Sequence, residues 1–143
     1  HLGNAGDTIV EVLIAIAVVS AVLGGAFAAT RRSLLGARAS QERSEAVKLV
    51  EAQLESLKSA LQDETKSNQI FSLATNFCLD DNLNVVSDTN AACKQGTDSR
   101  YRLSIGSIAI PSSTGRTFIA TARWDKVGGG PEEKADIVYK AYR

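Results

Sequence analysis

The chain has 143 residues, with 16 basic side chains, 16 acidic side chains and one histidine, so its formal charge at pH 7 is zero. Such a length supports one small domain beside an extended segment but not two domains. His1 and two cysteines, Cys78 and Cys93, match no zinc-ligand spacing, and no metal or cofactor is expected.

The first predicted element is an apolar helix. Residues 12–30 form 19 consecutive uncharged positions, and at ~1.5 Å per residue they span about 28 Å, close to the hydrocarbon thickness of a bilayer. Glu11 stands at the head of this run, where a carboxylate is unfavourable unless it has a partner. The pattern predicts a transmembrane or bundle-core helix over residues 7–30.

The order of Gly6, four further residues, Glu11 and an apolar helix resembles the N-terminal signal of type IV pilins and pseudopilins. The resemblance implies that prepilin peptidase cleaves after Gly6 and methylates the new N-terminus at Asp7. Glu11 would then be fifth in the mature chain, as in the family. Residues 1–6 would be a leader remnant or an unprocessed N-terminus. Asp7 departs from the apolar first residue that pilins usually carry.

Small residues recur at every fourth position of the apolar helix, which is how helices pack closely in lipid. We therefore expect assembly contacts at Glu11 and at the small residues Ala17, Ala21, Gly24, Gly25 and Ala28. The alternative is an alanine-rich composition without a packing role. The paired glycines also weaken the helix locally. They predict an unwound stretch in an assembled filament and a continuous helix in the isolated subunit.

Residues 31–62 continue the helix with a different surface. Apolar residues spaced three and four apart predict a stripe that packs on a sheet, formed by Val47, Val50, Leu54, Leu57 and Leu61. The intervening charged residues are expected to face water: Glu42, Glu45, Lys48, Glu51, Glu55 and Lys58. A plain coiled coil is the alternative, although the stripe lasts barely three heptads.

Residues 63–99 are predicted to be a polar connector with a short strand over residues 83–86. In an exported domain Cys78 and Cys93 would form a disulfide that stabilises the fold by about 3 kcal/mol. Oxygen-bearing side chains follow Cys78 in a pattern that is similar to a calcium loop, with candidate ligands Asp80, Asn82, Asn84 and Asp88. The loop lacks the required glycine and bidentate glutamate, so a solvated acidic turn is the alternative.

Residues 100–143 are predicted to form an antiparallel sheet of three strands. Tyr101, Leu103 and Ile105 alternate, and a bulge at Gly106 would shift the phase to Ile108 and Ile110. Turns over residues 111–115 and 127–131 would separate the strands. Phe118, Ala120, Ala122 and Trp124 are expected on one face of the second strand, with Ile137 and Tyr139 on one face of the third.

The charges are segregated along the chain. Residues 63–93 carry one basic and five acidic side chains, a sum of −4, and residues 94–143 carry nine and five, a sum of +4. Opposite signs would let subunits attract one another, although solvated faces without a partner remain the alternative. Basic and aromatic residues interleave in the last segment, which keeps weak DNA binding open as a second interpretation.

The sequence thus predicts an α+β fold: a long N-terminal helix packed on a small antiparallel sheet, with residues 31–143 as a globular head. No nucleophile elbow or phosphate loop is present, so no enzyme is expected. The resemblance implies a structural pilus subunit that forms homo-oligomeric helical filaments outside the cell, with an unassembled pool in the inner membrane. Prepilin peptidase and the pilus assembly machinery would be its partners, and adhesion, motility or DNA uptake its use. A pseudopilin or minor pilin, and a membrane-anchored binding domain, are the alternatives.

Overall fold

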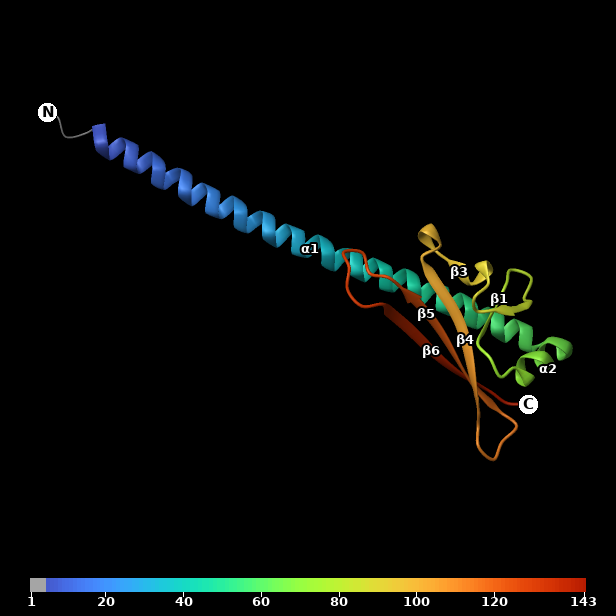
Figure 1. Cartoon of the computed structure of the whole chain (residues 1–143). Helices are drawn as coiled ribbons and strands as arrows, with labels where there is room; N and C mark the ends of the chain where they lie inside the picture. The colour runs from blue at the N-terminus through green and yellow to red at the C-terminus, as the bar shows by residue number, and fades with distance from the viewer. Residues whose placement is uncertain (1–4) are drawn as a thin grey trace. The chain divides into compact units, whose positions relative to one another are not determined.

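The computed structural model describes residues 5–143, with side chains from residue 8 onward. The contacts divide the chain into two compact units, one ending at Arg38 and the other comprising Ala39–Arg143. We call the first the apolar unit and the second the head unit. The boundary falls inside helix α1, Ala5–Leu61; Figure 1 shows this helix at the N-terminal end of the chain.

The apolar unit consists of the first part of α1. Proline is absent from it, and Ile, Val, Leu and Ala dominate between Ile9 and Ala29. The helix continues without a break through Gly24 and Gly25. This confirms the continuous helix expected of the isolated subunit. Large apolar side chains are exposed on every side of this helix, for example Ile14 at 58% and Phe27 at 71%.

The second part of α1 supplies one wall of the core of the head unit. Its fully buried apolar residues are Ala46, Val50, Leu57 and Ala60, while Val47, Leu54 and Leu61 pack at the margin of the core. The predicted stripe is therefore confirmed, with its centre rotated toward the two alanines.

The other wall is one antiparallel sheet with the strand order β2-β1-β4-β5-β6, and β3 adds to the edge of β4 (Figure 1). The strands are β1 (Phe77–Leu79), β2 (Val85–Ser87), β3 (Lys94–Gln95), β4 (Tyr101–Ala109), β5 (Arg116–Trp124) and β6 (Glu133–Ala141). The predicted meander of three strands is confirmed as β4, β5 and β6, which pair in continuous register.

The inner face of the sheet carries the large side chains of the core. Leu103 and Ile105 of β4 lie opposite Ala122 and Ala120 of β5. The predicted face of β5 is confirmed, since its four members are at most 2% exposed: Phe118, Ala120, Ala122 and Trp124. At these two pairs, a large side chain of β4 therefore lies beside a small one of β5.

The segment 63–99 is more ordered than the predicted polar connector. Helix α2, Glu64–Ser72, begins at Asp63, whose side chain accepts hydrogen bonds from the backbone N–H groups of Thr65 and Lys66. This capping is a sequence signal that the prediction missed. Ile70 of α2 is fully buried. The predicted strand at residues 83–86 is displaced to β2, because Leu83 has a positive φ of 60° in the preceding turn.

Cys78 and Cys93 form a disulfide with a Cα–Cα distance of 5.8 Å. It joins β1 to the short 3₁₀ helix η1, Ala91–Cys93; a second 3₁₀ turn, η2, spans Thr97–Ser99. Both cysteines are completely buried. The bond therefore fixes the segment between helix α2 and strand β4 to the core.

The bulge predicted at Gly106 is wrong. The pairing of β4 with β5 runs without interruption from Arg102 to Ala109, so the side chains keep one alternation. Ile108 consequently lies on the outer face of the sheet, 61% exposed. A Cβ at Gly106 would lie 3.0 Å from the side-chain oxygen of Asn76. Gly106 therefore serves close packing rather than a change of phase.

One buried polar side chain connects α1 to the sheet. Gln53, 5% exposed, donates from Nε2 to the carbonyl oxygen of Leu79 at 3.0 Å and accepts from its N–H at 3.2 Å. The Gln53 amide thus makes the same pair of hydrogen bonds to β1 that the backbone of a neighbouring strand would make. Both backbone groups of Leu79 depend on it for their hydrogen bonds.

We predict that Gln53→Ala destabilises the head unit by about 2 to 4 kcal/mol, because it leaves a buried N–H and a buried carbonyl unsatisfied. The measurement is urea unfolding of the detergent-solubilised chain. Fluorescence can follow it specifically, because Trp124 is the only tryptophan. Gln41→Ala, at an exposed position of the same helix, is the matched control and should change stability by less than about 0.5 kcal/mol. Equal stability of the two variants would contradict the role given to Gln53.

Candidate functional site

The first candidate site is the surface of the apolar unit. Glu11 is exposed on α1, and no ion pair joins its carboxylate to another side chain between residues 8 and 143. The small residues predicted to mediate assembly, from Ala17 to Ala28, are likewise exposed. None of this surface is buried within the chain. The structure therefore leaves the whole predicted assembly surface available to a bilayer or to other helices.

The glycines of this surface are not required by the fold of a single chain. A Cβ added at Gly24 or Gly25 would meet nothing within 4 Å. Gly6 and Asp7, the predicted processing positions, lie in the first turn of α1, and His1–Asn4 lie outside the described residues. The helix α1 is long and apolar enough to cross a membrane.

The second candidate site lies in the head unit around Glu42, which is 7% exposed. The prediction that Glu42 faces water is therefore wrong. Its Oε1 accepts from Arg100 Nη1 at 3.0 Å and from the backbone N–H of Val127 at 3.2 Å. The carboxylate thus joins α1 to the start of β4 and to the turn that follows β5. A charge with two such donors is tolerated at a buried position.

One helical turn along α1, Glu45 holds the segment before β4. Its Oε1 accepts from the N–H of Thr97 at 2.8 Å and from the Thr97 hydroxyl at 2.9 Å, while Oε2 accepts from the Tyr101 hydroxyl at 3.1 Å. The Thr97 N–H in particular lowers the pKa of Glu45 below its ordinary value. Gly96 has a φ of 80°, and a Cβ there would collide with the Tyr101 ring at 2.4 Å. Any other residue at Gly96 would therefore disturb this contact.

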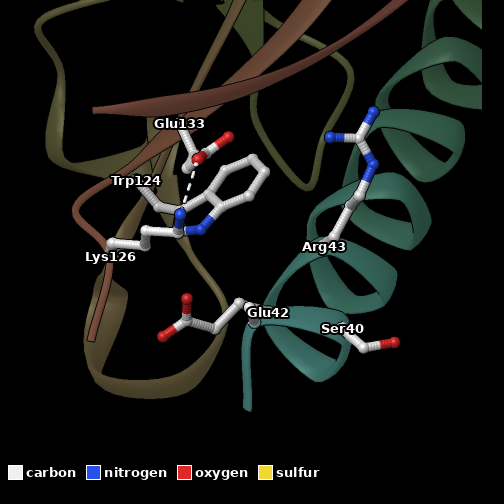
Figure 2. Close-up of a pocket in the computed structure, with 7 residues that line it drawn as sticks. Ser40, Glu42, Arg43, Trp124, Lys126 and Glu133 are labelled. Carbon is white, nitrogen blue, oxygen red and sulfur yellow. Dashed lines mark ion pairs between the residues drawn. The ribbon is translucent and has the colours of Figure 1, made fainter. Parts of the chain in front are cut away.

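A cavity of about 360 Å³ opens beside Glu42, between α1 and the ends of β5 and β6. Figure 2 shows the indole of Trp124 between the α1 side chains and Glu133 of β6. Lys126 Nζ lies 3.2 Å from the Glu133 carboxylate. Trp124 is 2% exposed, and its Nε1 has no hydrogen-bond partner among the described residues. The cavity therefore contains an unsatisfied donor.

The candidate calcium ligands form a turn that is closed by its own backbone. Asp80 Oδ1 accepts from the N–H of Asn84 at 2.8 Å and of Asn82 at 2.9 Å, and these bonds lower the pKa of Asp80, the one from Asn84 most. Lys66 Nζ donates to the carbonyl oxygen of Asn82 at 3.1 Å. Asp88 follows β2, outside this turn. Because Asp80 Oδ1 already accepts from two backbone N–H groups, these contacts favour the solvated acidic turn over the metal loop.

The basic and aromatic residues of the last segment do not form one surface. Tyr101 and Trp124 are buried, and Tyr139 lies under Lys58 Nζ at 5.5 Å from its ring centroid. Several cations contact acidic groups: Arg100 with Glu42, Arg102 with Glu132 and Asp125, and Lys134 with Asp136. Arg116 donates to the Phe71 carbonyl oxygen. Of the aromatic residues Tyr101, Trp124, Tyr139 and Tyr142, it is Tyr142 that is largely exposed, at 67%, and weak DNA binding stays a prediction.

The contacts of Glu42, Gln53 and Trp124 were not predicted from the sequence. One available signal was the spacing of Glu42 and Gln53 on the helix. Eleven residues are about three helical turns, so both side chains lie on the same face as Ala46, Val50 and Leu57. Polar residues on the apolar face of a helix must find hydrogen-bonding partners. The cavity beside Trp124 left no comparable trace in the sequence.

The fold is α+β, with a long apolar N-terminal helix whose later part packs on a small antiparallel sheet, and this is the architecture that the type IV pilin resemblance implied. Comparisons with protein-family models, with curated proteins and with solved structures each found no match.

We predict that replacing Gly24 and Gly25 together by alanine leaves the helix of the isolated subunit intact, because each new Cβ has open space and alanine favours a helix by ~1 kcal/mol. Filament yield or elasticity should change, since close approach or unwinding at this point is lost. Gly36→Ala is the matched control, because its Cβ also meets nothing and it lies outside the predicted assembly residues. A filament map with unbroken helix from Val12 to Leu35 would exclude unwinding and leave only close packing.

A second prediction concerns the Tyr101 phenol. Burial, above all, raises its pKa from 10.0 to about 12. The native state holds the neutral phenol, so the associated stability is present in full below pH 10 and is lost as the pH rises toward about 12. The difference between the phenolate absorbance titrations of the native chain and of Tyr101→Phe should show this late step. A difference centred at pH 10 would contradict it.

Proposed function

We propose that this protein is a structural subunit of a type IV pilus or a closely related filament, held in a membrane by α1 before assembly. The observation that carries the proposal is a membrane-length apolar helix with no buried surface, headed by a carboxylate and continuous with a helix that packs on a sheet. Large apolar surfaces left exposed by folding require lipid or other protein chains around them.

Glu11 supports assembly rather than simple anchoring. A carboxylate at the head of an apolar segment is costly in lipid and gains a role when neighbouring helices bring it a donor. In the pilin resemblance that donor is the N-terminal amine produced by cleavage after Gly6. The recurrent small residues then give the packed helices room for one another.

The head unit supports a location outside the cytoplasm. Its buried disulfide, Cys78–Cys93, belongs in an oxidising compartment. The described residues contain no group of three or more His, Cys, Asp or Glu side chains suited to hold a metal ion. The proposed role is structural: the subunit forms the polymer.

The test is Glu11→Ala, expressed in place of the native chain in cells that assemble it. Filaments in sheared surface fractions should fall at least about tenfold, because a subunit without its carboxylate cannot complete the paired contact in the bundle. Electron microscopy counts the filaments, and mass spectrometry of them identifies the subunit and its N-terminal residue.

Glu51→Ala is the matched control, since it removes an exposed carboxylate from the same helix within the head unit. It should leave the yield unchanged. Native filament yield from Glu11→Ala would remove Glu11 from the mechanism. A protein absent from filaments in the wild type would favour a membrane-anchored binding domain, and one present in traces a minor pilin or pseudopilin.

A further inference from the structure

The cavity beside Trp124 lies at the end of the head unit where α1 enters it, and it is lined by Ser40, Glu42 and Arg43 of α1 together with Trp124, Lys126 and Glu133. In Figure 2 the nitrogen edge of the indole is turned toward the space between Lys126 and Glu42. Trp124 is 98% buried, and its N–H has no acceptor among the described residues. A buried donor without an acceptor is a free-energy cost that an incoming oxygen would remove.

The charges around the cavity favour an acidic occupant. Four of the lining residues are ionised, two of each sign. Glu42 is neutralised by Arg100 at 3.0 Å, and Glu133 is neutralised by Lys126 at 3.2 Å. Arg43 remains exposed, with no ion pair to another described residue. The cavity is therefore bordered by a guanidinium without an ion pair and by a covered indole N–H without an acceptor, which a small side-chain movement would open to an incoming oxygen.

Acidic groups of complementary sign lie in the segments that follow the other end of α1. Leu61, the last residue of α1, is 18 positions beyond Arg43, about 27 Å at ~1.5 Å per residue. Glu64, in the first turn of α2, is exposed and has no ion pair within the described chain. Asp63 caps α2 through Oδ1, and Asp81 in the adjacent turn is exposed. This end therefore presents carboxylates, with Glu64 the one least needed by its own fold.

We infer that the cavity receives the acidic end of a second copy of this chain, with Glu64 paired to Arg43 and a carboxylate or carbonyl oxygen of the same segment accepting from Trp124. The inference rests on the proposed function and names one contact of the filament. Two different surfaces at opposite ends of one unit make a heterologous contact, which generates an open polymer rather than a closed dimer. Complementary charge fixes the register of such a contact.

The experiment is a charge exchange in cells that assemble the native chain. Arg43→Glu and Glu64→Arg, each alone, should lower the yield of sheared filaments at least about tenfold, because each places like charges together. The two substitutions combined should restore the yield to within about threefold of native. Lys48→Glu is the matched control for a charge reversal on the exposed side of the same helix, and it should retain native yield.

Head folding is checked in every variant by urea unfolding followed through Trp124 fluorescence, so a misfolded single variant is recognised. Native yield from both folded single variants, or no restoration in the folded double variant, overturns the inference. When Glu11→Ala still abolishes the filaments, that failure leaves the proposed function standing. A fluorescence response of the detergent-dispersed native chain to succinate, together with native yield from both reversals, would assign the cavity to a small dicarboxylate instead. Filaments without this chain in the wild type overturn both proposals.

Discussion

The exposed apolar surface of α1 is the constraint on which the rest of the molecule depends. Folding buries apolar area where it can, and the side chains between Ile9 and Phe27 remain more than half exposed at their large positions. Within the head unit, the inner face of the sheet packs on the later part of α1. In the proposed function, lipid surrounds the apolar unit first, and copies of the same helix surround it in the filament.

In the head unit the same helix must instead form part of a water-exposed fold. There, α1 buries a narrow apolar stripe, and several of its polar side chains form hydrogen bonds with the segments that pack on it. Gln53 hydrogen-bonds Leu79 of β1, Glu42 binds Arg100 and the turn at Val127, and Glu45 holds Thr97. These contacts bind three separate segments to one helix, so the position of the sheet along α1 is fixed by hydrogen bonds as well as by packing.

Periodicity made most of this fold predictable. The stripe around Val50 and Leu57 and the alternation in β5 each report a face that must be buried, and both predictions are confirmed. Helix α2 and strand β1 were missed because they are short and their burial depends on residues far away in sequence. The bulge at Gly106 was wrong for a related reason: the exposed Ile108 breaks the rule that apolar residues turn inward, and only the register with β5 shows it. The assembly residues remain predictions, since a single chain contains no neighbour to test them.

Each of the two units has chemically different ends. A filament that grows from a membrane must be polar, and a polar open polymer needs subunits whose two ends differ. The apolar unit differs at its ends because Glu11 stands at only one of them. In the head unit, the Arg43 end and the Glu64 end also differ, in charge and in the presence of a cavity. If helix packing supplies most of the association free energy through contacts that tolerate sliding, the paired charges are what select one axial register from many. Affinity and register would then be encoded in different units of the same chain, so that substitutions in the head unit can alter the order of the polymer without weakening the membrane-held subunit.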